Sequence, residues 1–267
     1  MKMTAYLKIV PYKKTIILFL FVFLSLIYWN TMKIYFTFDT TAPDLVEFGG
    51  EYVKSQLLST SISYNNALFE YNFYQSFGFP ILISFTGYSY SLLKSNYLKF
   101  YIGKNNLYAK NLMKLKIYSS LTVVLFFSMI YIIIIFIAAF GGVFHSKILE
   151  NDFARDSFLT IFSSSIGSYA IFYWLVKMIA LVLNSMLVYY CIDYFKRFSL
   201  GILTYLVFLW ILSPLMYMFV NNQYIVPMTS LMVTSYTELT VPQIILTYLP
   251  YLLFFVILWR TTDGEVC

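Results

Sequence analysis

Six stretches of this sequence are long enough to cross a bilayer and, apart from one lysine, carry no charge. A charged side chain at the centre of a bilayer costs several kcal/mol, and a helix needs about 20 residues to span it. The stretches lie at residues 15–32, 71–93, 117–144, 157–192, 198–220 and 239–259. The sequence therefore predicts an all-α integral membrane protein with six transmembrane helices in a single domain over residues 1–267.

The scarcity of charge supports this interpretation. Only 11% of the residues are charged, whereas a soluble domain carries roughly 25% because its surface faces water. The surface that lacks charge is expected to face lipid. The 26 tyrosines and 27 phenylalanines fit such a protein, since a tyrosine ring can lie at headgroup level with its hydroxyl in water.

Basic residues are sorted by side if the N-terminus is cytoplasmic. Lys and Arg accumulate in cytoplasmic loops, and thirteen of them then lie inside: Lys2, Lys8, Lys13, Lys14, Lys94, Lys99, Lys104, Lys110, Lys114, Lys116, Lys196, Arg197 and Arg260. Only four lie outside, namely Lys33, Lys54, Lys147 and Arg155. A missing helix would scramble this pattern, so we predict that both termini are cytoplasmic. The same sorting argues against nucleic-acid binding despite the net charge of +6.

Three shorter segments flank or join these stretches. Residues 1–14 are basic and amphipathic and are expected to lie along the inner membrane surface. Residues 36–71 form a long outer loop with an expected amphipathic helix around residues 51–58. Residues 221–241 mix apolar residues with Ser, Thr and Pro227. They are predicted either as short re-entrant helices shielded by protein or as a surface loop with some buried side chains.

The residue patterns of several catalytic and metal sites are missing. The one histidine, His145, has no cysteine or acidic cluster near it in sequence, so no metal site is expected. The sequence lacks H-E-x-x-H, G-x-S-x-G and the phosphate loop G-x-x-x-x-G-K-S/T. We therefore expect no enzyme activity, and any ATP with its Mg²⁺ would be bound by another chain. Cys191 and Cys267 lie far apart on the predicted inner side and indicate no disulfide.

Residues 94–116 form the one sizeable cytoplasmic loop, and they alternate lysines with apolar side chains. In a helical conformation Leu98, Tyr101 and Ile102 share one face, at positions i, i+3 and i+4. Such a face could dock into a groove of a cytoplasmic partner. Alternatively, the lysines meet anionic lipid while the aromatic rings lie in the membrane interface.

If the helix of the fourth stretch runs from about residue 167 to residue 192, Lys177 lies about ten residues from its outer end, near the middle of the membrane. A buried ammonium is costly, so the side chain is expected to face a cavity, a partner or a subunit interface. This position favours a role in a translocation pathway. The alternative is a helix shifted along the sequence, which would let the lysine extend to the outer surface.

Taken together, these segments resemble the permease subunit of an ABC-2 type (type V exporter) ABC transporter. The resemblance covers the whole chain as architecture: a basic N-terminal segment, six spans, a basic cytoplasmic loop and a Pro-containing segment before the last span. The size and the Lys-, Asn-, Ile- and Tyr-rich composition are similar to bacteriocin or peptide export and immunity permeases of low-GC Gram-positive bacteria.

The resemblance implies a function and partners. The chain would sit in the cell membrane, pair with a second permease chain, and export an apolar or amphipathic substrate such as a peptide or drug. A cytoplasmic ATP-binding subunit would drive it through a coupling helix, formed here by Tyr97, Leu98, Lys99, Tyr101, Ile102, Gly103, Lys104, Leu107 and Tyr108. Two other classes stay open: a membrane scaffold or assembly factor that transports nothing, and an ion-coupled carrier that uses Lys177.

Overall fold

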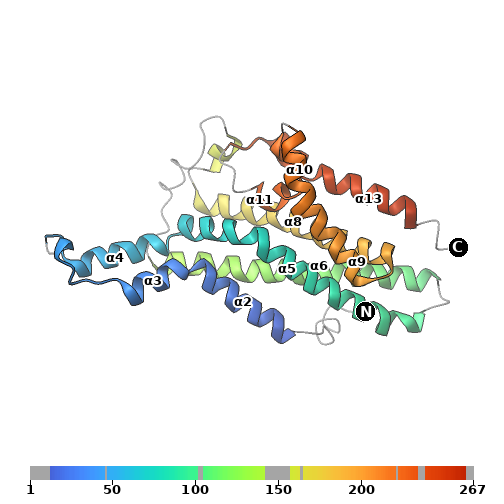
Figure 1. Ribbon diagram of the computed structural model, residues 1–267, viewed down its shortest axis with the longest axis horizontal. Coiled ribbons are helices and arrows are strands. Elements are labelled where there is room, and N and C mark those ends of the chain that lie inside the picture. The colour runs from blue at the N-terminus through green and yellow to red at the C-terminus, as the bar shows by residue number, and fades with distance from the viewer. Residues whose placement is uncertain are drawn as a thin grey trace.

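Helices account for the regular structure of the chain. The structure is a computed structural model that describes residues 13–45, 47–101, 105–141, 157–162, 165–220, 222–233 and 238–262, and these residues contain no strand. The long helices lie side by side along the long axis of the molecule (Figure 1). They are α2 (Lys13–Ile27), α5 (Tyr64–Tyr97), α6 (Asn105–Phe140), α8 (Ile166–Phe195), α9 (Phe198–Leu206) with α10 (Leu212–Phe219), and α12 (Val241–Leu246) with α13 (Leu249–Thr262).

Four of these helical segments are long and apolar enough to cross a membrane: residues 107–140, 166–195, 198–219 and 241–258. A fifth is obtained if α2 and α3 (Trp29–Thr37), which meet at an angle of 62°, count as one span. Large apolar side chains such as Ile132, Phe136 and Phe140 on α6 lie exposed on the outside of the bundle, where lipid is their natural solvent. The chain is thus a multi-pass, all-α membrane protein.

The second predicted span is a helix but a comparatively polar one. α5 is 34 residues long and starts at Ser63, whose side chain caps the helix by accepting a hydrogen bond from the Asn66 backbone N–H. Its first half contains Glu70, Asn72 and Gln75. α5 is not among the segments apolar enough to qualify by composition, so six spans stay a prediction.

The first predicted span, residues 15–32, is wrong as a continuous helix. α2 ends at Ile27, and the chain bends at Tyr28 into the more polar α3. Beyond the bend, the Asn30 side chain donates a 2.8 Å hydrogen bond to Glu70 near the start of α5. α3 then runs beside α4 (Gly50–Ser61), the amphipathic helix expected around residues 51–58. The two helices project from one end of the bundle (Figure 1).

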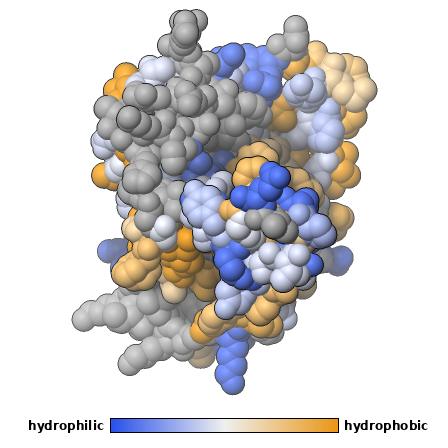
Figure 2. Space-filling model, turned by 90° about the vertical axis from the view of Figure 1, so that its left-hand side faces the viewer, coloured by the Kyte–Doolittle hydropathy of each residue, from blue (hydrophilic) through white to orange (hydrophobic). Residues whose placement is uncertain are grey.

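That end of the molecule presents a polar face. Figure 2 looks onto it: hydrophilic side chains gather over much of its middle, and apolar ones lie toward its edges. The distribution is what a face in contact with water requires, whereas the flanks of the bundle carry the exposed apolar side chains.

Tyrosines form much of the core. Tyr64, Tyr71, Tyr131 and Tyr173 are almost fully buried, together with Phe127. Tyr131 and Tyr173 stack at 5.3 Å between ring centroids, and the Tyr64 and Tyr131 hydroxyls lie 2.6 Å apart. A buried hydroxyl needs a hydrogen-bond partner, and neighbouring helices supply one for three of these four tyrosines.

α8 and α9 form a tight helical hairpin. α8 ends at Phe195 and is capped by Lys196, which adopts a left-handed conformation with φ of 54°, and α9 begins after Arg197. Gly201 on α9 lies against the α8 backbone: a Cβ added there would approach the Ile192 amide nitrogen to 2.6 Å. Only glycine fits this crossing without movement of one helix.

Gly201→Ala is therefore expected to lower the free energy of unfolding by about 1–3 kcal/mol, the usual cost of forcing atoms into a packed site. Thermal unfolding of the purified protein in detergent measures this loss. Gly167→Ala is the matched control, because the nearest atom to its added Cβ is 3.8 Å away. Equal melting temperatures for the two variants would show that the α8–α9 crossing is not close-packed.

Candidate functional site

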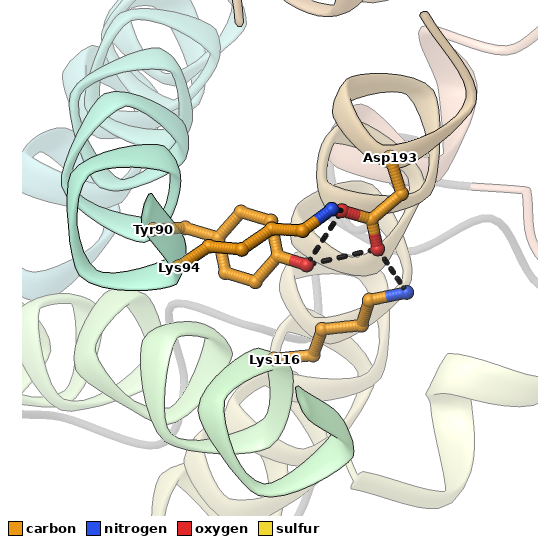
Figure 3. Close-up of polar contacts among 4 residues, drawn as sticks. All are labelled: Tyr90, Lys94, Lys116 and Asp193. Carbon is orange, nitrogen blue, oxygen red and sulfur yellow. Dashed lines mark hydrogen bonds and ion pairs between the residues drawn. The ribbon is translucent and has the colours of Figure 1, made fainter. Parts of the chain in front are cut away.

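Asp193, near the end of α8, binds three donors from two neighbouring helices (Figure 3). Lys94 Nζ lies 2.6 Å from Asp193 Oδ1, and Lys116 Nζ lies 2.8 Å from Oδ2. The Tyr90 hydroxyl donates to both carboxylate oxygens, at 2.8 and 2.9 Å. Tyr90 and Lys94 lie one turn apart on α5, and Lys116 lies on α6. One carboxylate thus joins α5, α6 and α8 at the same end of the bundle.

This Asp193 cluster is largely shielded from solvent. The exposed fractions of the Lys116 and Asp193 side chains are 6% and 11%, against 28% for Lys94. The Lys116 ammonium also lies 3.5 Å from the centroid of the Tyr190 ring, where the ring face attracts a cation. Buried charges need such partners, because removing them from water costs several kcal/mol per ion. Two ammonium groups against one carboxylate leave the cluster with an excess of one positive charge.

A groove of about 300 Å³ opens beside the cluster. Its polar lining comes from both ends of the α5–α6 connection and from the α8–α9 turn: Ser91, Lys94, Ser95, Lys99, Tyr108 and Lys196. Leu98 and Ile192 form the apolar part of its floor. The three lysines make this groove electropositive.

Lys177 forms a second polar centre, near the middle of α8. Its side chain is 1% exposed, and its ammonium donates to Gln75 Oε1 on α5 and to the Leu231 carbonyl of α11 (Thr229–Met232). Lys177 therefore does not extend to the outer surface. Its neighbour Gln75 in turn donates to Asn72 Oδ1 at 3.0 Å, which also accepts from the Tyr173 hydroxyl at 2.8 Å.

Asn184, two turns further along α8, binds the same inserted segment. Its Oδ1 accepts from the hydroxyls of Tyr205 on α9 at 3.1 Å and Tyr251 on α13 at 3.0 Å. Its Nδ2 lies 3.2 Å from Ser230 Oγ on α11. The Tyr251 hydroxyl also donates to the Pro227 carbonyl at 2.9 Å. Polar side chains of α8 and α13 thus bind backbone and side-chain groups of residues 227–231.

The segment of residues 222–233 therefore lies deep between the helices. Ser230 and Leu231 are buried, and Asn184, which contacts Ser230, is 18 residues into α8, or about 27 Å from its start at 1.5 Å per residue. Irregular backbone is tolerated at such depth only where protein shields it. Whether the segment enters the membrane from the outer side stays a prediction.

The predicted coupling residues lie around the α5–α6 connection. Tyr97 ends α5, a 3₁₀ turn η2 runs over Leu98–Tyr101, and Leu107 and Tyr108 lie in the first turns of α6. Leu98 and Tyr101 share a face of the turn, as expected from their spacing, but that face points inward and Leu98 is fully buried. Leu98 is therefore unavailable to a partner, because the turn packs it into the protein's own core. Ile102, Gly103 and Lys104 lie outside the described residues.

Phe100 is the prominent exposed side chain of this turn, with 73% of its surface accessible. The ammonium of the adjacent Lys99 lies 5.3 Å from its ring centroid. Leu107 is about half exposed. Among the described residues of the connection, Lys99, Phe100 and Leu107 thus offer the surface that a partner could contact.

No protein-family model, curated protein or solved structure matches this chain. Inference about its function therefore rests on the Asp193 cluster, on the groove beside it, on the Lys177 centre and on the sorting of charge along the sequence.

Sequence reasoning identified Lys177 but missed its partners and the Asp193 cluster. Gln75, Asn184 and Asp193 are polar residues in or next to predicted spans, and such residues face the protein interior and bind one another. Their positions were therefore a usable signal. Which of these residues bind one another could not be predicted, because Gln75 and Lys177 are 102 residues apart and Lys94 and Asp193 are 99 apart.

Proposed function

We propose that this chain is the membrane-spanning permease subunit of an ATP-driven ABC transporter of the ABC-2 type. It works in a bacterial plasma membrane with a separate ATP-binding subunit and a second permease chain, and it exports an apolar or amphipathic substrate such as a peptide or drug. ATP and Mg²⁺ are bound by the partner, since this sequence has no phosphate loop.

The observation that carries the proposal is the link between the α5–α6 connection and α8. A subunit that transmits force needs a contact surface attached rigidly to the helices that move. Lys99 and Phe100 provide an exposed surface, and one turn earlier Lys94 binds Asp193 of α8, which also binds Lys116 of α6. A displacement of this connection therefore acts on three helices together.

The alternatives receive less support from the geometry. An ion-coupled carrier that uses Lys177 needs that ammonium to meet ions from either side, whereas the side chain is buried and bound to Gln75 and Leu231. A scaffold without transport activity would have no use for an exposed aromatic residue attached to three helices, although it would share the same fold.

Affinity purification of the chain from its own membranes tests the proposal directly. An ATP-binding protein with a phosphate loop is expected to co-purify. We expect Phe100→Asp to weaken this association about thirtyfold, the scale of losing a buried aromatic anchor worth about 2 kcal/mol. Substrate-stimulated ATP hydrolysis should fall in parallel, while membrane insertion and thermal stability are unchanged.

Phe48→Asp is the matched control. Phe48 is 67% exposed and lies in the predicted outer loop, so the same change of residue should leave the association intact. If both variants retain the ATP-binding partner, or if the parent chain is active with no such partner, the coupling role of the α5–α6 connection is wrong.

A further inference from the structure

The groove beside the Asp193 cluster has the chemistry of an anion site. Three lysines line it, Lys94, Lys99 and Lys196, together with Ser91, Ser95 and Tyr108. No described residue that lines the groove is acidic, and the nearby Asp193 is already bound by Lys94, Lys116 and Tyr90. Positive charge on these described residues therefore exceeds negative charge, and the hydroxyl groups of Ser91 and Tyr108 stand beside it.

The fold, and not only the sequence, brings these lysines together. Lys94 is on α5, Lys99 on the 3₁₀ turn η2, and Lys196 at the left-handed residue that ends α8. Lys94 and Lys99 are close in sequence, but Lys196 reaches the groove only because α8 packs against α5 and ends beside it. The cavity of about 300 Å³ is large enough for a phosphate group with part of its alcohol.

Exposed apolar side chains adjoin the basic residues. Phe100 follows Lys99 with 73% of its surface exposed, Tyr194 precedes Lys196 with 42% exposed, and Phe198 is 41% exposed. A free anion in solution would gain nothing from such neighbours, whereas a lipid can place its headgroup on the lysines and its acyl chains against the aromatic rings. Basic pockets between helices on the cytoplasmic side are suited to anionic headgroups.

We propose that the groove binds the phosphate headgroup of an anionic phospholipid from the inner leaflet. Lys99 and Lys196 hold the phosphate, and Lys94 orients toward it while it remains bound to Asp193. The bound lipid fills the junction of α5, α6 and α8 on the side that faces the membrane interface. The site shares Lys99 and Phe100 with the coupling surface proposed above, and the lipid test below requires neither the ATP-binding subunit nor transport activity.

Lipid retention measured by native mass spectrometry tests the site. The purified protein is incubated with phosphatidylglycerol or with phosphatidylcholine in mixed micelles, and the bound lipid is counted after dissociation of the detergent. We expect phosphatidylglycerol to be retained over phosphatidylcholine. We expect the double variant Lys99→Gln/Lys196→Asn to weaken that retention at least about tenfold, since each lysine near a headgroup contributes substantially to binding. Asparagine also tolerates the left-handed backbone at position 196.

The matched control is Lys110→Gln/Lys114→Gln, which removes the same charge from the same predicted side but from outside the groove. It should retain phosphatidylglycerol as the parent does. Size-exclusion profiles and melting temperatures establish that both double variants are folded. If one of them does not fold, its two single substitutions are measured separately in its place.

Three results would overturn the proposal. Equal retention of the two lipids, or an equal loss in both double variants, would show that no specific headgroup site exists here. Displacement of phosphatidylglycerol by excess inorganic phosphate would assign the groove to a soluble anion. Unchanged lipid retention together with loss of a co-purifying protein would show that the lysines bind a partner's carboxylate instead.

Discussion

Asp193→Ala is expected to lower the free energy of unfolding by about 3–5 kcal/mol, the cost of leaving a buried charge without its partner. The substitution removes the one carboxylate that binds Lys94 and Lys116. The Lys116 side chain is only 6% exposed, so water cannot replace the carboxylate. The Tyr190 ring stays beside its ammonium but offsets only part of the loss. A large fall in melting temperature in detergent would report the effect.

Two further variants separate charge from packing in this experiment. Asp44→Ala removes an exposed acid from the outer loop and should change stability little. Asp193→Leu/Lys116→Leu removes a buried charge together with its partner and should recover much of the stability lost in Asp193→Ala. If Asp193→Ala and Asp44→Ala melt at the same temperature, the cluster does not hold the three helices together.

Lys177→Met should release the inserted segment of residues 222–233. Methionine has a similar length but cannot donate, so Gln75 Oε1 and the Leu231 carbonyl lose the ammonium they share. A buried acceptor that loses its partner costs about 1–3 kcal/mol, and two such groups give an expected loss of about 2–6 kcal/mol. Hydrogen exchange of the amides in residues 222–233 is expected to accelerate, while exchange in α6 changes less.

A substitution of Gln75, the partner of Lys177 on α5, tests whether the two residues act through one hydrogen-bonded network. Gln75→Leu removes the α5 side of the contact and leaves the Leu231 carbonyl bound to Lys177. The two substitutions act on one network, so the double variant should cost less than the sum of the single variants. Lys110→Met, at an exposed position on α6, is the control. Unchanged exchange in Lys177→Met would show that other contacts hold the segment.

The regular part of this fold could be predicted because hydrophobic length alone identifies a membrane helix. The helices at residues 198–219 and 241–258 match two predicted stretches closely, whereas those at 107–140 and 166–195 overlap two others but start about ten residues away from the predicted starts. The amphipathic α4 was also expected. In each case the signal lies in the local sequence, where a long apolar run indicates a membrane helix although the helix itself can extend past the flanking charges, as α6 does.

The remainder depends on contacts between distant residues. The bend at Tyr28 places Asn30 within hydrogen-bond distance of Glu70, a contact between residues 40 positions apart that no local pattern predicts. The polarity of α5 makes sense only once Asn72 and Gln75 face Tyr173 and Lys177. The inward direction of Leu98 could not be read from its spacing with Tyr101, because spacing groups side chains on a face without saying where that face points.

The wide helical turn η4 (Val207–Ile211) between α9 and α10 is of the π type, and it changes the direction in which the side chains of α10 point. One residue more per turn rotates the following helix by about 100° relative to an uninterrupted α-helix. Ser213 comes directly after this turn, and its hydroxyl accepts a 3.0 Å hydrogen bond from the Met228 amide. A regular helix would direct that hydroxyl elsewhere around the axis. The one additional residue in this helical turn thus orients Ser213 so that it binds Met228, fifteen positions away in the inserted segment.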